Sequence, residues 1–154
     1  FQNFFDDLIS FDVSTFRAEN ISEAKAHGIE TTLDLELCEK LNLETNYTYT
    51  DSENEITGIV LPRRPRHRAT IDLAFKPSEK LSGTLSLLLV NSRRESTGEK
   101  MDNYARVDLN LNDKYSERIS PYIRFENLFD ENYEEINGFG TPGFSVYAGL
   151  SLKL

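Results

Sequence analysis

Four arginines occur within six residues of a chain that is acidic overall, with 26 Asp and Glu against 17 Lys and Arg. This basic cluster consists of Arg63, Arg64, Arg66 and Arg68. Guanidinium groups bind carboxylates and phosphates through paired hydrogen bonds, so the cluster could contact an anionic ligand. The alternative is charge balance against carboxylates elsewhere in the chain, such as Glu30, Asp34 and Glu44.

The other chemically versatile side chains do not form catalytic or metal-binding patterns. His27 has no second histidine at ligand spacing, and His67 lies in the basic cluster, which disfavours a bound cation. The acidic run 51–55 lacks the spacing of an EF-hand, so a solvated loop is expected. The single cysteine, Cys38, excludes a disulfide framework. Without a Gly-x-Ser-x-Gly elbow or a Gly-rich phosphate loop, we expect no enzyme, no metal and no cofactor.

Composition excludes two further classes. The formal net charge of −9 argues against a nucleic-acid partner, because such proteins carry a basic patch or stripe. The longest aliphatic run, Leu87–Val90, is far shorter than the roughly 20 residues of a transmembrane helix. Membrane-spanning strands are only half apolar, so a membrane β-barrel remains possible.

Apolar and polar residues alternate along most of the chain, which is the pattern of strands with one apolar face. In the segment 41–50, for example, Leu41, Leu43 and Tyr47 alternate with Asn42 and Glu44. The pattern predicts about eight strands. They span approximately residues 1–10, 19–37, 41–51, 66–76, 81–92, 103–113, 118–127 and 143–154.

The links between these strands alternate in length. Short polar turns are expected near 38–40, 77–80 and 114–117, and longer links near 11–18, 51–65, 93–102 and 128–142. Outer-membrane barrels have short periplasmic turns and longer extracellular loops. An antiparallel up-and-down transmembrane β-barrel segment is therefore favoured over a soluble barrel. Aromatic residues near strand ends fit a membrane-interface girdle, although ordinary sheet core is the alternative; they are Phe4, Phe5, Phe11, Tyr47 and Tyr49.

A motif in the last third resembles the NLFDxxYE signature of TonB-dependent outer-membrane receptors. Its residues are Asn127, Leu128, Phe129, Asp130 and Tyr133, followed by Gly138 in a segment that resembles the aromatic-rich loop before the family's final strand. The segments 4–9, 20–30 and 61–67 resemble earlier parts of the same family in the same order. The resemblance thus covers nearly the whole chain.

The C-terminal strand carries a second resemblance. Tyr147, Gly149, Leu152 and Leu154 follow the spacing of the β-signal that the barrel-assembly machinery reads in outer-membrane proteins. Any closing β-strand could show a similar pattern. The resemblance implies that these four residues act in assembly.

The family resemblance implies a barrel of about 22 strands around an N-terminal plug. Residues 1–154 would then be the C-terminal segment of the barrel domain, about its last third. Because the chain starts at Phe1 and not at Met, we expect the plug and earlier strands to precede it. Localisation in the outer membrane of a Gram-negative bacterium is implied.

By resemblance, the whole receptor would import a scarce ligand such as a ferric siderophore, cobalamin or haem. Implied partners are outer-membrane lipid and lipopolysaccharide, the barrel-assembly machinery, and the TonB complex through the plug. The alternative is a self-contained eight-stranded outer-membrane barrel with a structural or adhesive role, because eight strands can close by themselves.

The alternation also predicts which side chains share a face. Lipid-facing residues on a convex face would be Leu33, Leu35, Leu43, Ile71, Leu73, Leu85, Leu87, Val107, Leu109, Ile123, Phe125, Leu150 and Leu152. The opposite face would carry Glu30, Asp34, Glu44, Asp72, Asp108, Arg124 and Lys153. For a segment of a larger barrel, the strands at 1–10 and 143–154 should not pair with each other.

Overall fold

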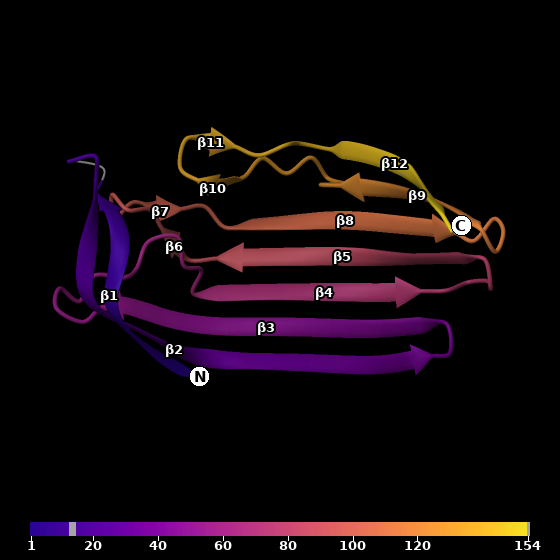
Figure 1. Cartoon of the computed structure of the whole chain (residues 1–154). Coiled ribbons are helices and arrows are strands. Elements are labelled where there is room, and N and C mark those ends of the chain that lie inside the picture. The colour runs from indigo at the N-terminus through magenta and orange to yellow at the C-terminus, as the bar shows by residue number, and fades with distance from the viewer. Residues whose placement is uncertain (13–14, 154) are drawn as a thin grey trace.

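The computed structural model describes residues 1–12 and 15–153, and eight antiparallel strands form its main sheet in the order β1-β2-β3-β4-β5-β8-β9-β12 (Figure 1). The strands are β1 (Gln2–Asp12), β2 (Arg17–Cys38), β3 (Leu41–Asn54), β4 (His67–Phe75), β5 (Leu81–Asn91), β8 (Tyr104–Asp113), β9 (Ile119–Glu126) and β12 (Ser145–Leu152). The predicted all-β, up-and-down segment of about eight strands is confirmed. Among the described residues, no helix is long and apolar enough to cross a membrane.

Two of the predicted plain links contain small β-ribbons. β6 (Arg93–Arg94) pairs with β7 (Lys100–Met101), and β10 (Glu134–Ile136) pairs with β11 (Phe139–Gly140). Strands of two or three residues are too short for an alternation pattern to reveal them. Gly98 and Gly138 lie in the turns of these ribbons with φ of 85° and 80°, a region that glycine adopts without steric cost.

The link between the first two strands is shorter than the predicted 11–18, so the bounds of that prediction were wrong. β1 extends to Asp12 and β2 begins at Arg17. β1 pairs with residues 17–27 of β2, whereas β3 pairs with β2 only from Ala24 onward. The hairpin therefore projects beyond the sheet (Figure 1). Phe4 and Phe5 lie near the start of β1, opposite Lys25 and Ala24 of β2, so they are close to a strand end as predicted, while the side chain of Phe11 lies outside the described residues.

The pairing register confirms the predicted division into two faces. Leu35, Leu43, Leu73, Leu85, Leu109, Phe125 and Val146 lie directly opposite one another in a single row across seven strands. Directly paired residues project from the same side of a sheet. All thirteen predicted lipid-facing residues lie on this apolar face. The charged residues predicted for the opposite face lie on the other side, with Lys153 just past the end of β12.

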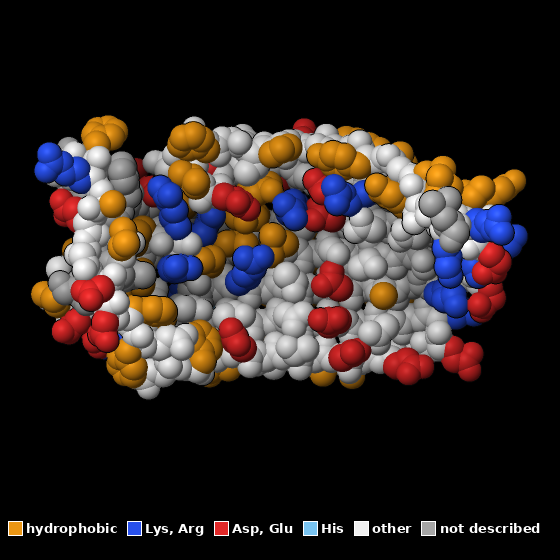
Figure 2. Space-filling view, viewed as in Figure 1, with side chains coloured by type: hydrophobic (Ala, Val, Ile, Leu, Met, Phe, Trp, Pro, Cys, Tyr) orange, Lys and Arg blue, Asp and Glu red, His pale blue; other side chains and the backbone are white. Residues whose placement is uncertain are grey.

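The polar face is the hollowed one (Figure 2), so the apolar face is convex. The apolar face is open: Leu33 is 49% exposed and Leu150 is 55% exposed. The main cluster of buried side chains lies instead on the polar face, where Val90, Tyr104 and Tyr133 pack together with Leu88. A single-layer sheet has no second layer to cover its convex side, so that side needs lipid.

The strands at the two ends of the sheet are β1 and β12. Within the described residues β1 pairs only with β2, and β12 pairs only with β9. The prediction that these two strands do not pair with each other is confirmed.

Candidate functional site

A row of carboxylates crosses the polar face. Asp34, Glu44, Asp72, Ser86 and Asp108 lie directly opposite one another on five successive strands of the sheet. Neighbouring side chains donate hydrogen bonds to the carboxylates: Asn42 to Asp34 (2.9 Å), Asn46 to Glu44 (2.9 Å), Ser86 to Asp72, and Arg106 to Asp108 (3.1 Å). This part of the hollow is therefore negatively charged and hydrophilic (Figure 2).

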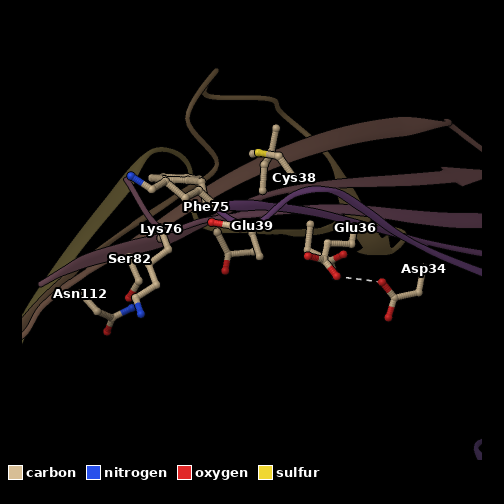
Figure 3. A pocket seen from close by; sticks show the side chains of 14 residues that line it. Asp34, Glu36, Cys38, Glu39, Phe75, Lys76, Ser82 and Asn112 are labelled. Atoms are coloured by element: carbon tan, nitrogen blue, oxygen red, sulfur yellow. Dashed lines mark hydrogen bonds between the residues drawn. The ribbon is translucent and has the colours of Figure 1, made fainter. Parts of the chain in front are cut away.

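A depression of about 590 Å³ lies on the same face toward the short turns (Figure 3). Asp34, Glu36, Glu39 and Lys76 contribute charged groups to it. The described residues contain no cluster of three or more His, Cys, Asp or Glu placed to hold a metal ion. The depression thus offers a wide surface with both charged and apolar side chains.

At the opposite end of the strands, a buried carboxylate joins three loops. Glu95, in the β5–β8 link, is only 6% exposed and accepts hydrogen bonds from the Arg63 guanidinium at 2.7 Å. It also accepts from the backbone amides of Ser96 at 3.0 Å and Asn137 at 3.2 Å. Arg63 belongs to the β3–β4 link and Asn137 to the β9–β12 link. The hydrogen bond from Arg63 outweighs burial and lowers the pKa of Glu95 to about 2.

The basic cluster has different partners from those expected. Arg63 pairs with Glu95 and Arg66 pairs with Asp51 at 2.7 Å, so charge balance against Glu30, Asp34 and Glu44 was wrong for these two arginines. Asp34 and Glu44 lie toward the short turns, whereas residues 61–66 lie at the loop end of the strands. Arg68 lies on the polar face, opposite Thr48 and Val90.

The acidic run 51–55 is also more structured than a solvated loop. Glu53 and Glu55 lie 3.0 and 3.8 Å from the Lys25 ammonium, and Asp51 contacts Arg66. Lys25 is directly opposite Glu53 in the β2–β3 register. Sequence analysis could not predict the ion pairs of Lys25, because Glu53 and Glu55 lie almost thirty residues further along the chain.

Neither histidine belongs to a group of three or more potential metal ligands in the described part of the chain. His67 is in the same row as Tyr49 on the apolar side, and its Nδ1 is 2.8 Å from the Tyr47 hydroxyl. His27 lies opposite Gln2 and Asp51 on β2. Tyr47 and Tyr49 thus project from the apolar face, close to where it meets the loops, as a membrane-interface girdle requires.

Asn127, the first residue of the NLFD motif, is 2% exposed. Its side chain accepts from the Glu131 amide at 2.8 Å and donates to the carbonyl oxygens of Glu131 at 2.9 Å and Pro142 at 3.4 Å. Its backbone amide donates to the Asp108 carboxylate at 2.9 Å. Asn127 also has a φ of 53°, which asparagine tolerates better than most residues. Its bonds hold both ends of the β9–β12 link beside β8.

Other motif residues also hold the β9–β12 link against the neighbouring strands. The Asp130 carboxylate accepts from the Phe144 amide at 2.8 Å, and the Leu128 amide donates to the Val107 carbonyl at 2.8 Å. The Tyr133 ring stacks on Tyr104 with centroids 4.2 Å apart. Phe129 is instead 79% exposed. Sequence analysis found the motif but not its contacts with Asp108 and Tyr104, because these residues are distant from it in the chain.

The residues of the C-terminal signal lie on both faces of β12. The Arg124 guanidinium lies over the Tyr147 ring at 4.8 Å, and the ring of Tyr122 lies directly over Gly149. Leu152 projects from the apolar face and is 61% exposed. Leu154 lies outside the described residues. Their role in assembly stays a prediction.

The amino-acid sequence matches a known protein family. The model of TonB-dependent receptor-like β-barrels matches residues 1–128. The chain belongs to the TonB-dependent receptor family. Members of this family are outer-membrane receptors of Gram-negative bacteria and not enzymes, which fits a sheet with one lipid-facing side and one polar side.

A curated relative, the iron-regulated outer membrane virulence protein of Vibrio cholerae, is 27% identical over 90% of this chain and 22% of its own length. The ferric enterobactin receptor of Pseudomonas aeruginosa has the same fold, with a TM-score of 0.80 at 20% identity over 98% of this chain and 28% of that one. The copper transporter OprC has a TM-score of 0.79 at 17% identity, over 97% and 27%. This TonB-dependent receptor chain therefore spans about a quarter of the length of its relatives.

Proposed function

We propose that the chain forms part of the passage wall of an outer-membrane receptor that imports a scarce ligand. The observation that carries this proposal is the polarity of the sheet: a row of apolar residues covers the convex face, and charged side chains line the hollow. A transmembrane barrel with an aqueous interior requires this arrangement. Residues 1–154 would be the C-terminal segment of its barrel domain.

An iron chelate, such as a ferric siderophore or haem, is the ligand class that the observations favour over cobalamin. The V. cholerae relative is named as iron-regulated, and the loop end of the hollow carries a concentration of Arg and Lys side chains (Figure 2). Cationic groups at an entrance raise the local concentration of an anionic ligand. Energy would come from the TonB complex, through a plug that precedes this segment in the whole receptor.

The motif residues have a supporting role in this proposal. Asn127, Asp130 and Tyr133 would hold the β9–β12 link at the rim of the passage, and Tyr147, Gly149, Leu152 and Leu154 would be read by the barrel-assembly machinery. Outer-membrane lipid and lipopolysaccharide would contact the apolar face. A self-contained eight-stranded barrel finds no support, because β1 and β12 are not paired with each other in the described residues.

Transport can be tested in the native bacterium under iron limitation. Deletion of the full-length receptor gene should abolish uptake of at least one ⁵⁵Fe-loaded siderophore from a panel of catecholate and carboxylate types. Uptake should return with the wild-type gene and should require TonB. Radiolabelled cobalamin serves as the matched control and should enter equally well in both strains. Unchanged uptake of every iron chelate, together with loss of cobalamin uptake, would contradict the proposal.

A further inference from the structure

A cavity of about 270 Å³ lies at the loop end of the hollow, between the β3–β4 link and the β5–β8 link. Its charged and polar lining includes Asp51, Ser52, Arg64, Arg66, Arg93 and Lys100. Its volume is at the lower limit of small-molecule pockets, so it suits one functional group of a ligand better than a whole chelate.

The lining has uncompensated positive charge. Asp51 is paired with Arg66, so the only acidic group of the described lining is already neutralised. Arg94, another lining residue, donates to the Gly98 carbonyl at 2.9 Å. Within the described part of the chain, the side chains of Arg64 and Lys100 contact no acidic group, and both are exposed. Two free cationic groups therefore face the cavity beside a neutral ion pair.

Two buried donors independently indicate a ligand in the same cavity. Ser52 is 3% exposed and Arg93 is 5% exposed, yet the Ser52 hydroxyl and the Arg93 Nε have no hydrogen-bond partner among the described residues. Buried polar atoms are almost always hydrogen-bonded in folded proteins. Both residues line the cavity, so a group bound there would meet two donors that have no partner among the described residues.

Arg93 is held in place for such a contact. Its guanidinium donates to the carbonyl oxygens of Asp102 at 3.2 Å and Glu134 at 2.8 Å, and it lies over the Tyr104 ring at 5.0 Å. These contacts fix the orientation of the side chain while leaving Nε unused. A guanidinium oriented in advance loses little conformational freedom when it binds an anion.

We propose that this cavity binds an oxyanion, a carboxylate or phosphate group, through Arg93 Nε, the Ser52 hydroxyl, Arg64 and Lys100. Such a group supplies several acceptor lone pairs and a negative charge, which match the unpaired donors and the unpaired cations of the lining. That the oxyanion belongs to the imported chelate rests on the proposed function. The transported ligand would then carry a carboxylate or phosphate that is not used to bind iron.

The test uses the purified full-length receptor in detergent at low ionic strength, titrated calorimetrically with citrate and, separately, with inorganic phosphate. We expect the wild type to bind at least one of them, and the preferred probe identifies the oxyanion. The double variant Arg64→Gln/Lys100→Gln should weaken binding at least tenfold. Ser52→Ala, which leaves the net charge unchanged, should weaken it several-fold.

The matched control is Lys114→Gln/Arg118→Gln, which removes the same charge at the short-turn end; its affinity should stay within twofold of wild type. Heat-modifiable gel mobility confirms that each variant is folded. If the receptor bound neither citrate nor phosphate, or if the control variant weakened binding as much as Arg64→Gln/Lys100→Gln, the proposed oxyanion site would be wrong. A receptor that binds citrate but imports no iron would contradict only the proposed function, because binding to purified protein needs no TonB.

Discussion

Gly28 on β2 lies so close to Tyr49 on β3 that a β-carbon at position 28 would overlap the Tyr49 carbonyl oxygen. The ring of Phe1 borders the same position, and the Phe1 and Gly28 backbones exchange hydrogen bonds of 2.9 and 3.0 Å. Position 28 is therefore where three chain segments meet at the base of the projecting hairpin. Only a residue without a side chain fits there.

Replacing Gly28 with alanine should destabilise the receptor by about 1–3 kcal/mol, because backbone atoms cannot move aside as a flexible side chain can. Urea unfolding of the full-length receptor in detergent, followed by intrinsic fluorescence, measures the change. Gly140→Ala is the matched control, since a β-carbon there would meet nothing within 4 Å. Equal stability of the two variants would show that β2 and β3 are not this close.

Glu95 should make the loop assembly sensitive to acid. Its pKa in the folded protein is about 2, below the value of roughly 4.3 for an unfolded chain. The stabilisation is therefore fully present above about pH 4.3 and is lost as the pH falls toward 2. Replacing Glu95 with glutamine should cost about 1–2 kcal/mol at pH 7, since Arg63 is half exposed and partly screened.

The urea midpoint of Glu95→Gln should thus lie below that of wild type at pH 7, and the difference should shrink between pH 4.3 and pH 3. Glu39→Gln serves as the control, because Glu39 is exposed at a short turn. It should match wild type at every pH. A difference for Glu95→Gln that is constant or larger in acid would disprove the charge-based account of this contact.

Asn127 should be the motif residue whose loss most loosens the β9–β12 link. Substitution by alanine removes three side-chain hydrogen bonds at a buried position, which predicts a loss of about 1–3 kcal/mol. Limited proteolysis within 128–144 should become faster. Asn132→Ala, at an exposed position of the same link, is the control and should leave the cleavage rate unchanged. Equal rates for both variants would mean that the link is held by other contacts.

The 154-residue chain produced alone should not form a water-soluble monomer. Its convex face exposes a continuous apolar surface, and soluble monomers tolerate patches of only a few hundred Å². The strands β1 and β12 also have unpaired edges within the described residues, which promotes association through strand pairing. Size-exclusion chromatography with light scattering should find aggregates without detergent. A monodisperse species of 17.7 kDa would refute this expectation.

The strands and their facing were predictable because a single local pattern controls both. Alternation at Leu41, Leu43 and Tyr47 identifies a strand and its apolar side, and a shift of one residue would place charges in lipid. The short ribbons at 93–101 and 134–140 have too few residues to show any period. The contacts of the basic cluster were also inaccessible, because Arg63 and Glu95 are 32 residues apart and meet only through the fold of two links.

Within the NLFD motif, the pattern identified Asn127 but not its function. The hydrogen bonds to Pro142 and Asp108 depend on residues 15 and 19 positions away. The buried donors of Ser52 and Arg93 could not be found from sequence either, since burial of polar atoms depends on how the loops pack.

The orientation of the two faces is the central claim, and nitroxide accessibility tests it most directly. In the full-length receptor in liposomes, with Cys38→Ser and any other native cysteines replaced, spin labels are attached at Leu109→Cys and Asn110→Cys. These neighbours on β8 project from opposite faces. Leu109 should be accessible to oxygen, which concentrates in lipid, and Asn110 to a water-soluble nickel chelate. The reverse pattern would show that the charged face meets the membrane and would contradict this account.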